Sequence, residues 1–198
     1  MRHIPFRVLV AAAAVATLYG CAAVPPREPL PTKHPSTFFD AQRAFLGGDY
    51  ESAATKFDAS GKEQPGLSAE AAYWIGVCRL KQGQLNKAEG EFRRCLANKP
   101  DPTLELKART GIGQSYQQRA QYSQAIKTYE QVLHSNSRYI ERDLVSYNLG
   151  VCLVKSGDSA RGRTVLQEVV ARFPKSQWAP SAREMLKSGP SAKGAAGK

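Results

Sequence analysis

The sequence predicts an all-α protein, a right-handed α-solenoid of about four helix–turn–helix units closed by a C-terminal capping helix. Three observations predict this fold. Turn-forming residues recur at nearly constant spacing, small residues flank each turn at fixed distances, and a large apolar residue follows each turn at a fixed distance. Repeats of this length are typical of architectures whose units bury their apolar faces only by stacking on neighbouring units.

The turns set the register of the repeat. The aligned turn residues lie 35, 37 and 37 residues apart and are Gly48, Gly83, Ala120 and Gly157. Glycine suits a turn between two helices because it adopts a left-handed backbone conformation that other residues resist. We therefore expect one helix to end before each of these residues and the next helix to begin just after it.

Small and large residues are placed so that the two helices of each unit can pack closely. The small residues seven positions before and five positions after the turns are Ala41, Gly76, Gly113 and Gly150, and Ala53, Ala88, Ala125 and Gly162. The large residues nine positions after the turns are Phe57, Phe92, Tyr129 and Leu166. Replacing Gly76 with Leu would wedge the helices apart, at a cost of about 1–3 kcal/mol or more.

Prolines and insertions define where the units end. Pro100 and Pro174 each lie 17 residues beyond a turn glycine and would end the second helix of their units. A last helix near residues 178–186 would close the stack. Three extra residues precede the third unit, at 103–105, and three precede the fourth, at 140–142.

Over residues 35–174 this pattern resembles the tetratricopeptide repeat, a helix–turn–helix unit of about 34 residues. The 37-residue period and the unit end at residues 172–176 are similar to bacterial envelope members. These are the lipoprotein of the outer-membrane β-barrel assembly machine, the periplasmic protein that works beside Tol–Pal, and the pilotin of type IV pilus secretins. The choice among these subfamilies stays open.

The resemblance implies that the first helices of successive units line a concave face that holds a segment of a partner protein. The lining positions are Phe38, Phe45, Tyr73, Val77, Lys81, Gln114, Gln118, Tyr147, Val151 and Lys155. The same count includes Gln42, Leu46, Glu70, Leu80, Lys107, Thr110, Gln117, Leu144 and Val154. Some family members clamp acidic C-termini with lysines. Tyr73, Thr110 and Tyr147 occupy the positions where lysine is needed, so that binding mode is not expected.

The first 20 residues read as a signal peptide. Arg2 and Arg7 supply a positive start, and residues 8–18 are an unbroken stretch of 11 apolar or small residues. Such a stretch is long enough for export and too short to span a bilayer, which needs about 20 residues.

Residues 18–21, Leu-Tyr-Gly-Cys, resemble a bacterial lipobox. The resemblance implies that Cys21 is acylated and becomes the N-terminus after cleavage. Ala22 in the next position is similar to the pattern that sorts lipoproteins to the outer membrane. The alternative is ordinary cleavage after Ala23, which would release a soluble periplasmic protein.

The segments around the repeat domain differ in composition from it. Residues 21–36 would form a lipid-attached Cys and Pro-rich spacer, since residues 24–36 hold five prolines. The repeat domain would occupy residues 37–187. Residues 188–198 are mainly Gly, Ala, Ser and Lys, a composition that predicts a disordered tail.

Residues with reactive side chains do not form a catalytic or metal-binding pattern. Apart from Cys21, the cysteines are Cys78, Cys95 and Cys152, which fall where the repeat takes small buried side chains. A bridge between Cys78 and Cys95, within one helical hairpin, stays open. The three histidines form no cluster. We expect no enzyme, no metal, no cofactor and no small-molecule substrate.

The formal net charge is +11, from 28 Lys and Arg against 17 Asp and Glu, but no run of basic residues exceeds two. A nucleic-acid partner is therefore not expected. The sequence predicts a non-catalytic scaffold that binds protein partners in the cell envelope and is anchored to the outer membrane by a lipid. The alternatives are a soluble periplasmic adaptor and a basic binder of an anionic envelope polymer.

Overall fold

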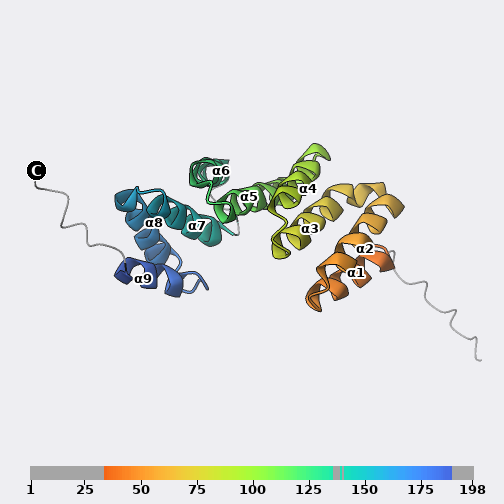
Figure 1. Ribbon diagram of the computed structural model, residues 1–198, viewed down its shortest axis with the longest axis horizontal. Coiled ribbons are helices and arrows are strands. Elements are labelled where there is room, and N and C mark those ends of the chain that lie inside the picture. Colours follow the sequence, from red (N-terminus) through yellow and green to blue (C-terminus); the bar gives the residue numbers. More distant parts are fainter. Residues whose placement is uncertain (1–33, 136–138, 140, 189–198) are drawn as a thin grey trace, which may run out of the picture. The chain divides into compact units, whose positions relative to one another are not determined.

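The computed structural model of the protein describes residues 34–135, 139 and 141–188 (Figure 1). All of the described residues belong to one compact unit of the chain. The predicted signal peptide, the lipid site Cys21, the spacer up to residue 33 and the tail from residue 189 lie outside the described residues.

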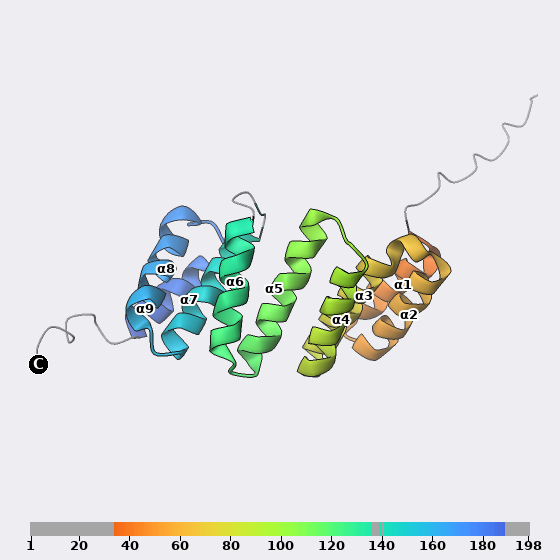
Figure 2. The same ribbon diagram turned by 90° about the horizontal axis from the view of Figure 1, so that it is seen from above.

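The described residues form α-helices joined by short connections, with no strand among them (Figure 1). The helices are α1 Ser36–Leu46, α2 Tyr50–Glu63, α3 Ser68–Lys81, α4 Leu85–Ala97, α5 Pro102–Gln118, α6 Tyr122–Ser135, α7 Arg142–Lys155, α8 Ser159–Arg172 and α9 Ala179–Ser188. Consecutive helices pack against each other (Figure 2). In addition, α3 contacts α5, and α5 contacts α7. The prediction of an all-α helical repeat is confirmed.

The turns adopt the backbone conformation that the register predicts. Gly48, Gly83 and Gly157 have φ angles of +82°, +72° and +100°. The fourth aligned residue, Ala120, adopts the same conformation at φ +58°. A side chain in this region is strained, so the turn between α5 and α6 has a backbone that glycine would adopt more readily.

The ends of the helices follow from proline and capping residues. Helix α4 ends three residues before Pro100, and α8 ends two residues before Pro174. The three-residue insertion before the third unit lengthens α5 to 17 residues. Asp101 caps this longer helix by accepting hydrogen bonds from the backbone N–H groups of Thr103 and Leu104, at 2.8 and 3.0 Å.

The large and small residues of the repeat pack on each other. Their large members, Phe57, Phe92, Tyr129 and Leu166, are all 0% exposed. A Cβ atom added to Gly76 would lie 2.8 Å from the ring of Phe92, and one added to Gly111 of the next unit would meet the same ring. The ring of Phe92 is therefore held between two glycines from successive units.

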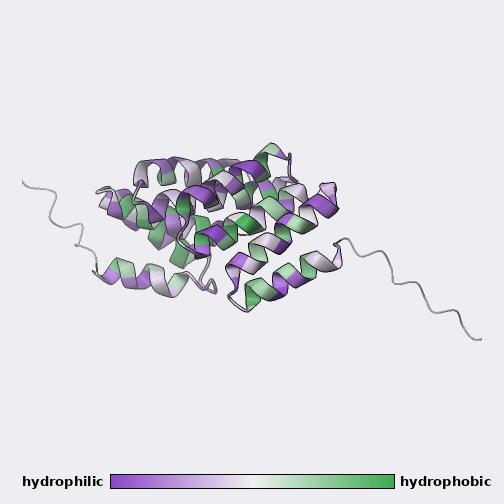
Figure 3. Cartoon of the chain, turned by 45° about the vertical axis from the view of Figure 1, so that its right-hand side comes forward, coloured by the Kyte–Doolittle hydropathy of each residue, from purple (hydrophilic) through white to green (hydrophobic). Residues whose placement is uncertain are grey.

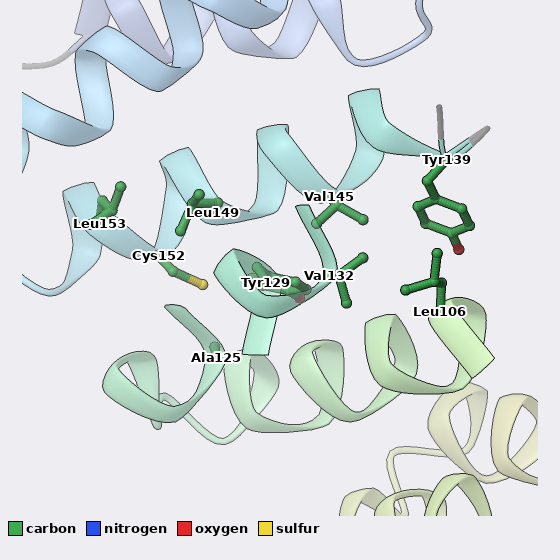
Figure 4. Packing of buried hydrophobic residues seen from close by; sticks show 9 residues of the cluster. All are labelled: Leu106, Ala125, Tyr129, Val132, Tyr139, Val145, Leu149, Cys152 and Leu153. Carbon is green, nitrogen blue, oxygen red and sulfur yellow. The ribbon is translucent and has the colours of Figure 1, made fainter. Parts of the chain in front are cut away.

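The core differs between the two halves of the domain. The first two units join through aromatic rings, since Trp74 stacks on Phe57 with centroids 5.6 Å apart and meets Phe45 edge-on. The last two units join through the cluster of Figure 4, which holds Leu106, Ala125, Tyr129, Val132, Tyr139, Val145, Leu149, Cys152 and Leu153. Figure 3 shows polar and apolar residues alternating around the helices, as expected where each helix buries one face.

Ion pairs join successive units in the first half of the domain. Arg79 of α3 donates to Glu51 of α2, with Nη2 3.1 Å from Oε1, and holds the pKa of this carboxyl at about 2. Glu89 of α4 is 7% exposed and accepts from Arg119 and from Tyr116 Oη, the latter at 3.0 Å. Burial opposes ionisation of Glu89, but these hydrogen bonds hold its pKa below the ordinary value.

Candidate functional site

The first helices of three units line a groove of about 430 Å³, which we call the α3–α5–α7 groove. Its lining residues are Tyr73, Val77, Leu80 and Lys81 of α3, Gln114, Gln117 and Gln118 of α5, Leu144 and Asn148 of α7, and Trp178 before α9. The volume falls within the range of about 300–1,000 Å³ that is common for binding sites.

The structure brings together half of the groove residues that the sequence predicts. Five of the ten line the α3–α5–α7 groove, namely Tyr73, Val77, Lys81, Gln114 and Gln118. Tyr147 lies beside it, stacked on the lining residue Trp178. Lys155 is exposed but does not line the groove.

Three predicted positions turn towards the core. Phe38 is 1% exposed and packs edge-on against Phe57, with ring centroids 5.2 Å apart. Val151 is 6% exposed. The prediction that Phe38 and Val151 line an open surface is therefore wrong, because these side chains fill space between neighbouring helices. Phe45 is partly buried between Tyr50 and Trp74.

The groove combines apolar walls with amide groups and carries one charged side chain. Val77, Leu80, Leu144 and Trp178 supply apolar surface, and Lys81 is the single charged residue among those that line it. An extended peptide needs hydrogen-bond partners for its main chain and apolar surface for alternate side chains. The lining offers both.

The hydroxyl of Tyr73 is a hydrogen-bond donor at neutral pH. Burial of this side chain raises its pKa to about 12, and the negative charge of Glu141 acts in the same direction. The phenol therefore stays protonated over the physiological range. Its ring lies against Trp74 and Phe92, with centroids 5.6 and 5.9 Å away, which fixes its position at the groove.

Asn148 is a polar residue of the groove whose amide has no hydrogen-bond partner among the described residues. The residue is 7% exposed. Gln117 differs, because its Oε1 accepts from the hydroxyl of Tyr129 at 2.8 Å. Neither amide atom of Asn148 is among the buried side-chain atoms that lack a partner, so both are accessible to solvent. The amide of Asn148 offers two N–H donors and one acceptor to whatever occupies the groove.

Trp178 forms the wall of the groove nearest the C-terminus. Tyr147 stacks on it with ring centroids 5.3 Å apart and an angle of 20°. Its backbone N–H donates to Ser176 Oγ at 3.1 Å, and the Ser176 hydroxyl in turn donates to Asp143 of α7. The connection between α8 and α9 is thus tied to α7 and holds the indole in place.

Sequence reasoning missed Asn148 and Trp178. Asn148 stands at the position taken by Trp74 in the second unit and Gly111 in the third, so a comparison of the units could have drawn attention to it. Trp178 lies outside the repeat units, in the connection between α8 and α9, and no spacing rule leads to it.

The three cysteines of the described residues are buried and unpaired, so no bridge joins Cys78 to Cys95. Burial raises the pKa of each thiol to about 11, which leaves Cys78, Cys95 and Cys152 protonated at neutral pH. Within residues 34–135, 139 and 141–188, no group of three or more His, Cys, Asp or Glu residues could hold a metal ion. None of the helices described there is long and apolar enough to cross a membrane.

A family model described as tetratricopeptide repeat matches residues 41–101 and 110–177. MamA from Desulfovibrio magneticus RS-1 is similar in structure, with a TM-score of 0.60 and 19% identity over 77% of this chain and 86% of that chain. A thermophilic TPR protein of Thermus thermophilus gives a TM-score of 0.59 and 20% identity over 76% of this chain and 78% of that chain.

The APC/C hetero-tetramer Cut9–Hcn1 gives a TM-score of 0.66 and 16% identity, over 79% of this chain and 30% of that chain. At these identities the likeness shows a shared fold alone. No curated protein matches the chain in sequence.

Proposed function

The chain belongs to the tetratricopeptide repeat family, and on that premise we propose that it is a non-catalytic scaffold of the bacterial cell envelope. Proteins of this family generally bind other proteins and do not catalyse reactions. The segment of the partner would lie in the α3–α5–α7 groove. A lipid on Cys21 would anchor the scaffold to the outer membrane, with the repeat domain facing the periplasm.

The unpaired amide of Asn148 is the observation that carries the proposal. A carboxamide can donate to a peptide carbonyl and accept from a peptide N–H, so it fits a main chain whatever the side chains are. Gln114 and Gln118 lie on the same groove and make no hydrogen bond with the described residues. Together these amides can bind an extended segment through its backbone.

The apolar wall would hold side chains of the same segment. Val77, Leu144 and Trp178 present apolar surface to the groove, and aromatic side chains often contribute most of the binding energy at protein interfaces. Cut9–Hcn1 is a hetero-tetramer by its description, so a similar stack of helices serves in an assembly with another protein.

Photo-crosslinking in living cells tests the site and does not require the identity of the partner. A photoreactive residue placed at the exposed groove position Gln118 should capture one dominant protein. The same residue at Gln167, which is exposed on α8 and does not line the groove, serves as the matched control. Capture of the same protein with equal yield from both positions would contradict groove binding.

The variant Asn148→Leu separates the hydrogen bonds of the Asn148 amide from the shape of its side chain. Asn148→Leu keeps a side chain of similar size and removes the amide, so partner capture at Gln118 should fall by about tenfold, which corresponds to the loss of one or two hydrogen bonds. Circular dichroism would confirm that the helices are intact. Unchanged capture would show that the amide does not contact the partner.

The anchor has an independent test. Cys21→Ser should abolish incorporation of labelled palmitate and move the protein from the membrane fraction to the soluble fraction. Unchanged fractionation would favour the alternative, a soluble periplasmic adaptor released by cleavage after Ala23. The groove experiment is unaffected by this outcome.

One further observation favours an anionic polymer of the envelope as the ligand. Arg172, Lys175, Arg183 and Lys187 lie in or near α8 and α9, and none forms an ion pair with the described residues. Exposed unpaired cations suit an anionic envelope polymer. If the protein binds such a polymer through these cations, binding should disappear in moderate salt, because salt screens interactions between surface charges. Asn148→Leu should leave this binding unchanged, because the groove is not involved.

A further inference from the structure

The helices that line the α3–α5–α7 groove end in a row of residues that holds two lysines. Lys81, Gln118 and Lys155 are the last residues of α3, α5 and α7, and each stands two positions before the aligned turn residue of its unit. Because α5 contacts both α3 and α7, the three positions form one edge, which we call the basic edge. The last four residues of each helix include no Asp or Glu. Asp158, which follows in the next turn, caps α8 and accepts from Arg161.

The two lysines of the basic edge have no charged partner within the described part of the chain. Lys81 and Lys155 are exposed, and neither forms an ion pair there. Nearby arginines differ, because Arg79 pairs with Glu51 and Arg119 pairs with Glu89. The domain neutralises these arginines with its own carboxylates and leaves the two lysines available to a group from outside.

The fold does not require a cation at this position of the repeat. A lysine in the last turn of a helix offsets the negative end of the helix dipole. Leu46 and Gln118 occupy the same position in the first and third units, and α1 and α5 end there with uncharged residues. The lysines are therefore a property of the second and fourth units and not of the repeat itself.

The opposite edge of the groove, where α3, α5 and α7 begin, carries charges of both signs. Glu70 of α3 lies 3.0 Å from Nε2 of His34, and Lys107 of α5 is half-buried. Burial raises the pKa of Tyr73, and the negative charge of Glu141, just before α7, raises it further. A carboxylate brought to the groove is repelled by Glu141 and attracted to the exposed lysines of the basic edge.

We propose that the partner segment in the groove is acidic, with Asp or Glu side chains that bind Lys81 and Lys155 and apolar side chains that pack in the α3–α5–α7 groove. This inference rests on the proposed function, because it states the chemistry of the segment that the groove would hold. The charge of the whole chain acts in the same direction, since a formal net charge of +11 attracts acidic partners and speeds their association.

Side-chain carboxylates of an internal segment fit the basic edge better than a C-terminal carboxylate. Tyr73, Thr110 and Tyr147 stand where a clamp for acidic C-termini needs lysine. Packed helices lie about 8–10 Å apart, so α5 separates Lys81 from Lys155 by about 16–20 Å, which one carboxylate does not bridge. An extended chain advances about 3.3 Å per residue. Two acidic residues about five or six positions apart therefore match the two lysines.

Selection of random linear peptides on the full chain carrying Cys21→Ser tests the charge of the segment. The parent should select peptides with two Asp or Glu about five or six residues apart and apolar residues between them. The double variant Lys81→Glu, Lys155→Glu should select Lys or Arg at these places, because attraction for a carboxylate becomes repulsion. The matched control Lys56→Glu, Lys127→Glu changes exposed lysines of α2 and α6 outside the groove and should select as the parent does.

The affinity of one selected peptide, measured by fluorescence anisotropy, gives the size of the effect. Lys81→Gln together with Lys155→Gln should weaken binding by about tenfold, since it removes two exposed ion pairs. Leu144→Ser should weaken binding by a similar factor, because Leu144 lines the groove and supplies apolar surface to the same peptide. Circular dichroism would confirm that the helices of each variant are intact.

Two results would overturn the proposal. One is that the parent and the double variant Lys81→Glu, Lys155→Glu select peptides of the same charge. The other is binding that depends on both lysines and is unchanged by Leu144→Ser, with inorganic polyphosphate competing for the site. That result would assign the basic edge to an anionic polymer.

Photo-capture at Gln118 separates this inference from the proposed function. If the double variant Lys81→Glu, Lys155→Glu still captures the partner as the parent does, the groove function stands and the acidic segment is rejected. If the parent captures no dominant protein at Gln118, the proposed function fails, whichever peptides the chain selects.

Discussion

The junction of α2 with α3 and the junction of α6 with α7 occupy the same place in the repeat, yet they are built from different side chains. At the first junction Trp74 stacks on Phe57, and Arg79 binds Glu51. At the second, Val132 packs in one cluster with Val145, Leu149 and the rings of Tyr129 and Tyr139. The repeat therefore specifies the volume that each junction must fill, and either stacked rings or a mixture of rings and branched aliphatic chains can fill it.

We expect the two halves of the domain to respond differently to a change in volume. A ring such as Phe92, held between glycines of two units, has little room to move. An aliphatic side chain such as Leu166 has more rotamers and can give way. We expect the half of the domain that holds Phe92 to be more sensitive to substitution than the half that holds Leu166, and four measurements test this difference.

The largest effect is expected from removal of a buried large residue. Phe92→Ala should lower the free energy of unfolding by about 3–5 kcal/mol, and Leu166→Ala by about 2–4 kcal/mol, because the larger side chain leaves the larger cavity. Urea unfolding followed by circular dichroism measures both. If Phe92→Ala lowers the free energy of unfolding less than Leu166→Ala does, the half of the domain that holds Phe92 is not the more sensitive one.

Adding a methyl group to a glycine tests the same difference with a smaller change. Gly111→Ala should cost about 2–3 kcal/mol because the new Cβ meets the Phe92 ring, and Gly150→Ala about 1–2 kcal/mol because it meets the Leu166 side chain. Gly90→Ala is the control. Its Cβ has no atom within 4 Å, so in a helix interior it should stabilise by about 0.5–1 kcal/mol.

The turn of the third unit differs from the others by its alanine. Ala120→Gly should raise the free energy of unfolding by about 0.5–1 kcal/mol, because glycine adopts the φ of +58° without steric strain. Gly83→Ala, at a φ of +72°, should lower it by a similar amount. Thermal unfolding of the two variants beside the parent chain gives the comparison, and shifts of equal sign would contradict it.

The smallest effect is expected from the ion pair at the first junction. Arg79 and Gln82 hold the pKa of Glu51 at about 2 in the folded protein, below its ordinary value of 4.5. The stabilisation is therefore present above about pH 4.5 and is lost as the pH falls towards 2. It is modest, because solvent screens an exposed pair.

A comparison of acid unfolding curves detects this contribution. Glu51→Gln should flatten the pH dependence of stability between about pH 4.5 and 2. Glu168→Gln changes an exposed carboxylate that forms no ion pair with the described residues, and should leave the curve as it is. If both variants behave alike, the Glu51–Arg79 pair does not stabilise the first junction.

The sequence by itself determined the repeat register and the packing within each unit. The turn glycines, the small residues and the large residue at +9 act over a few turns of one helical hairpin, so their spacing along the chain is enough to place them. Phe57, Phe92, Tyr129 and Leu166 are fully buried, as this spacing predicts. The end of α4 before Pro100 follows in the same way.

The tertiary structure alone decided which side chains face the groove. Phe38 and Tyr73 share one position of the repeat, but Phe38 is buried and Tyr73 lines the α3–α5–α7 groove. Whether that position is open depends on the helices stacked on either side, and the spacing within one unit does not contain this information. Trp178 reaches the groove through the Ser176–Asp143 contact, which joins α7 to a connection outside the repeat.

The exposure of Phe39 on α1, with 46% of its surface accessible, has the same physical origin. Phe39 and Trp74 share a position, and Trp74 is covered because another unit precedes it. The sequence shows which repeat positions hold apolar residues, and only the arrangement of neighbouring helices determines whether those residues are covered.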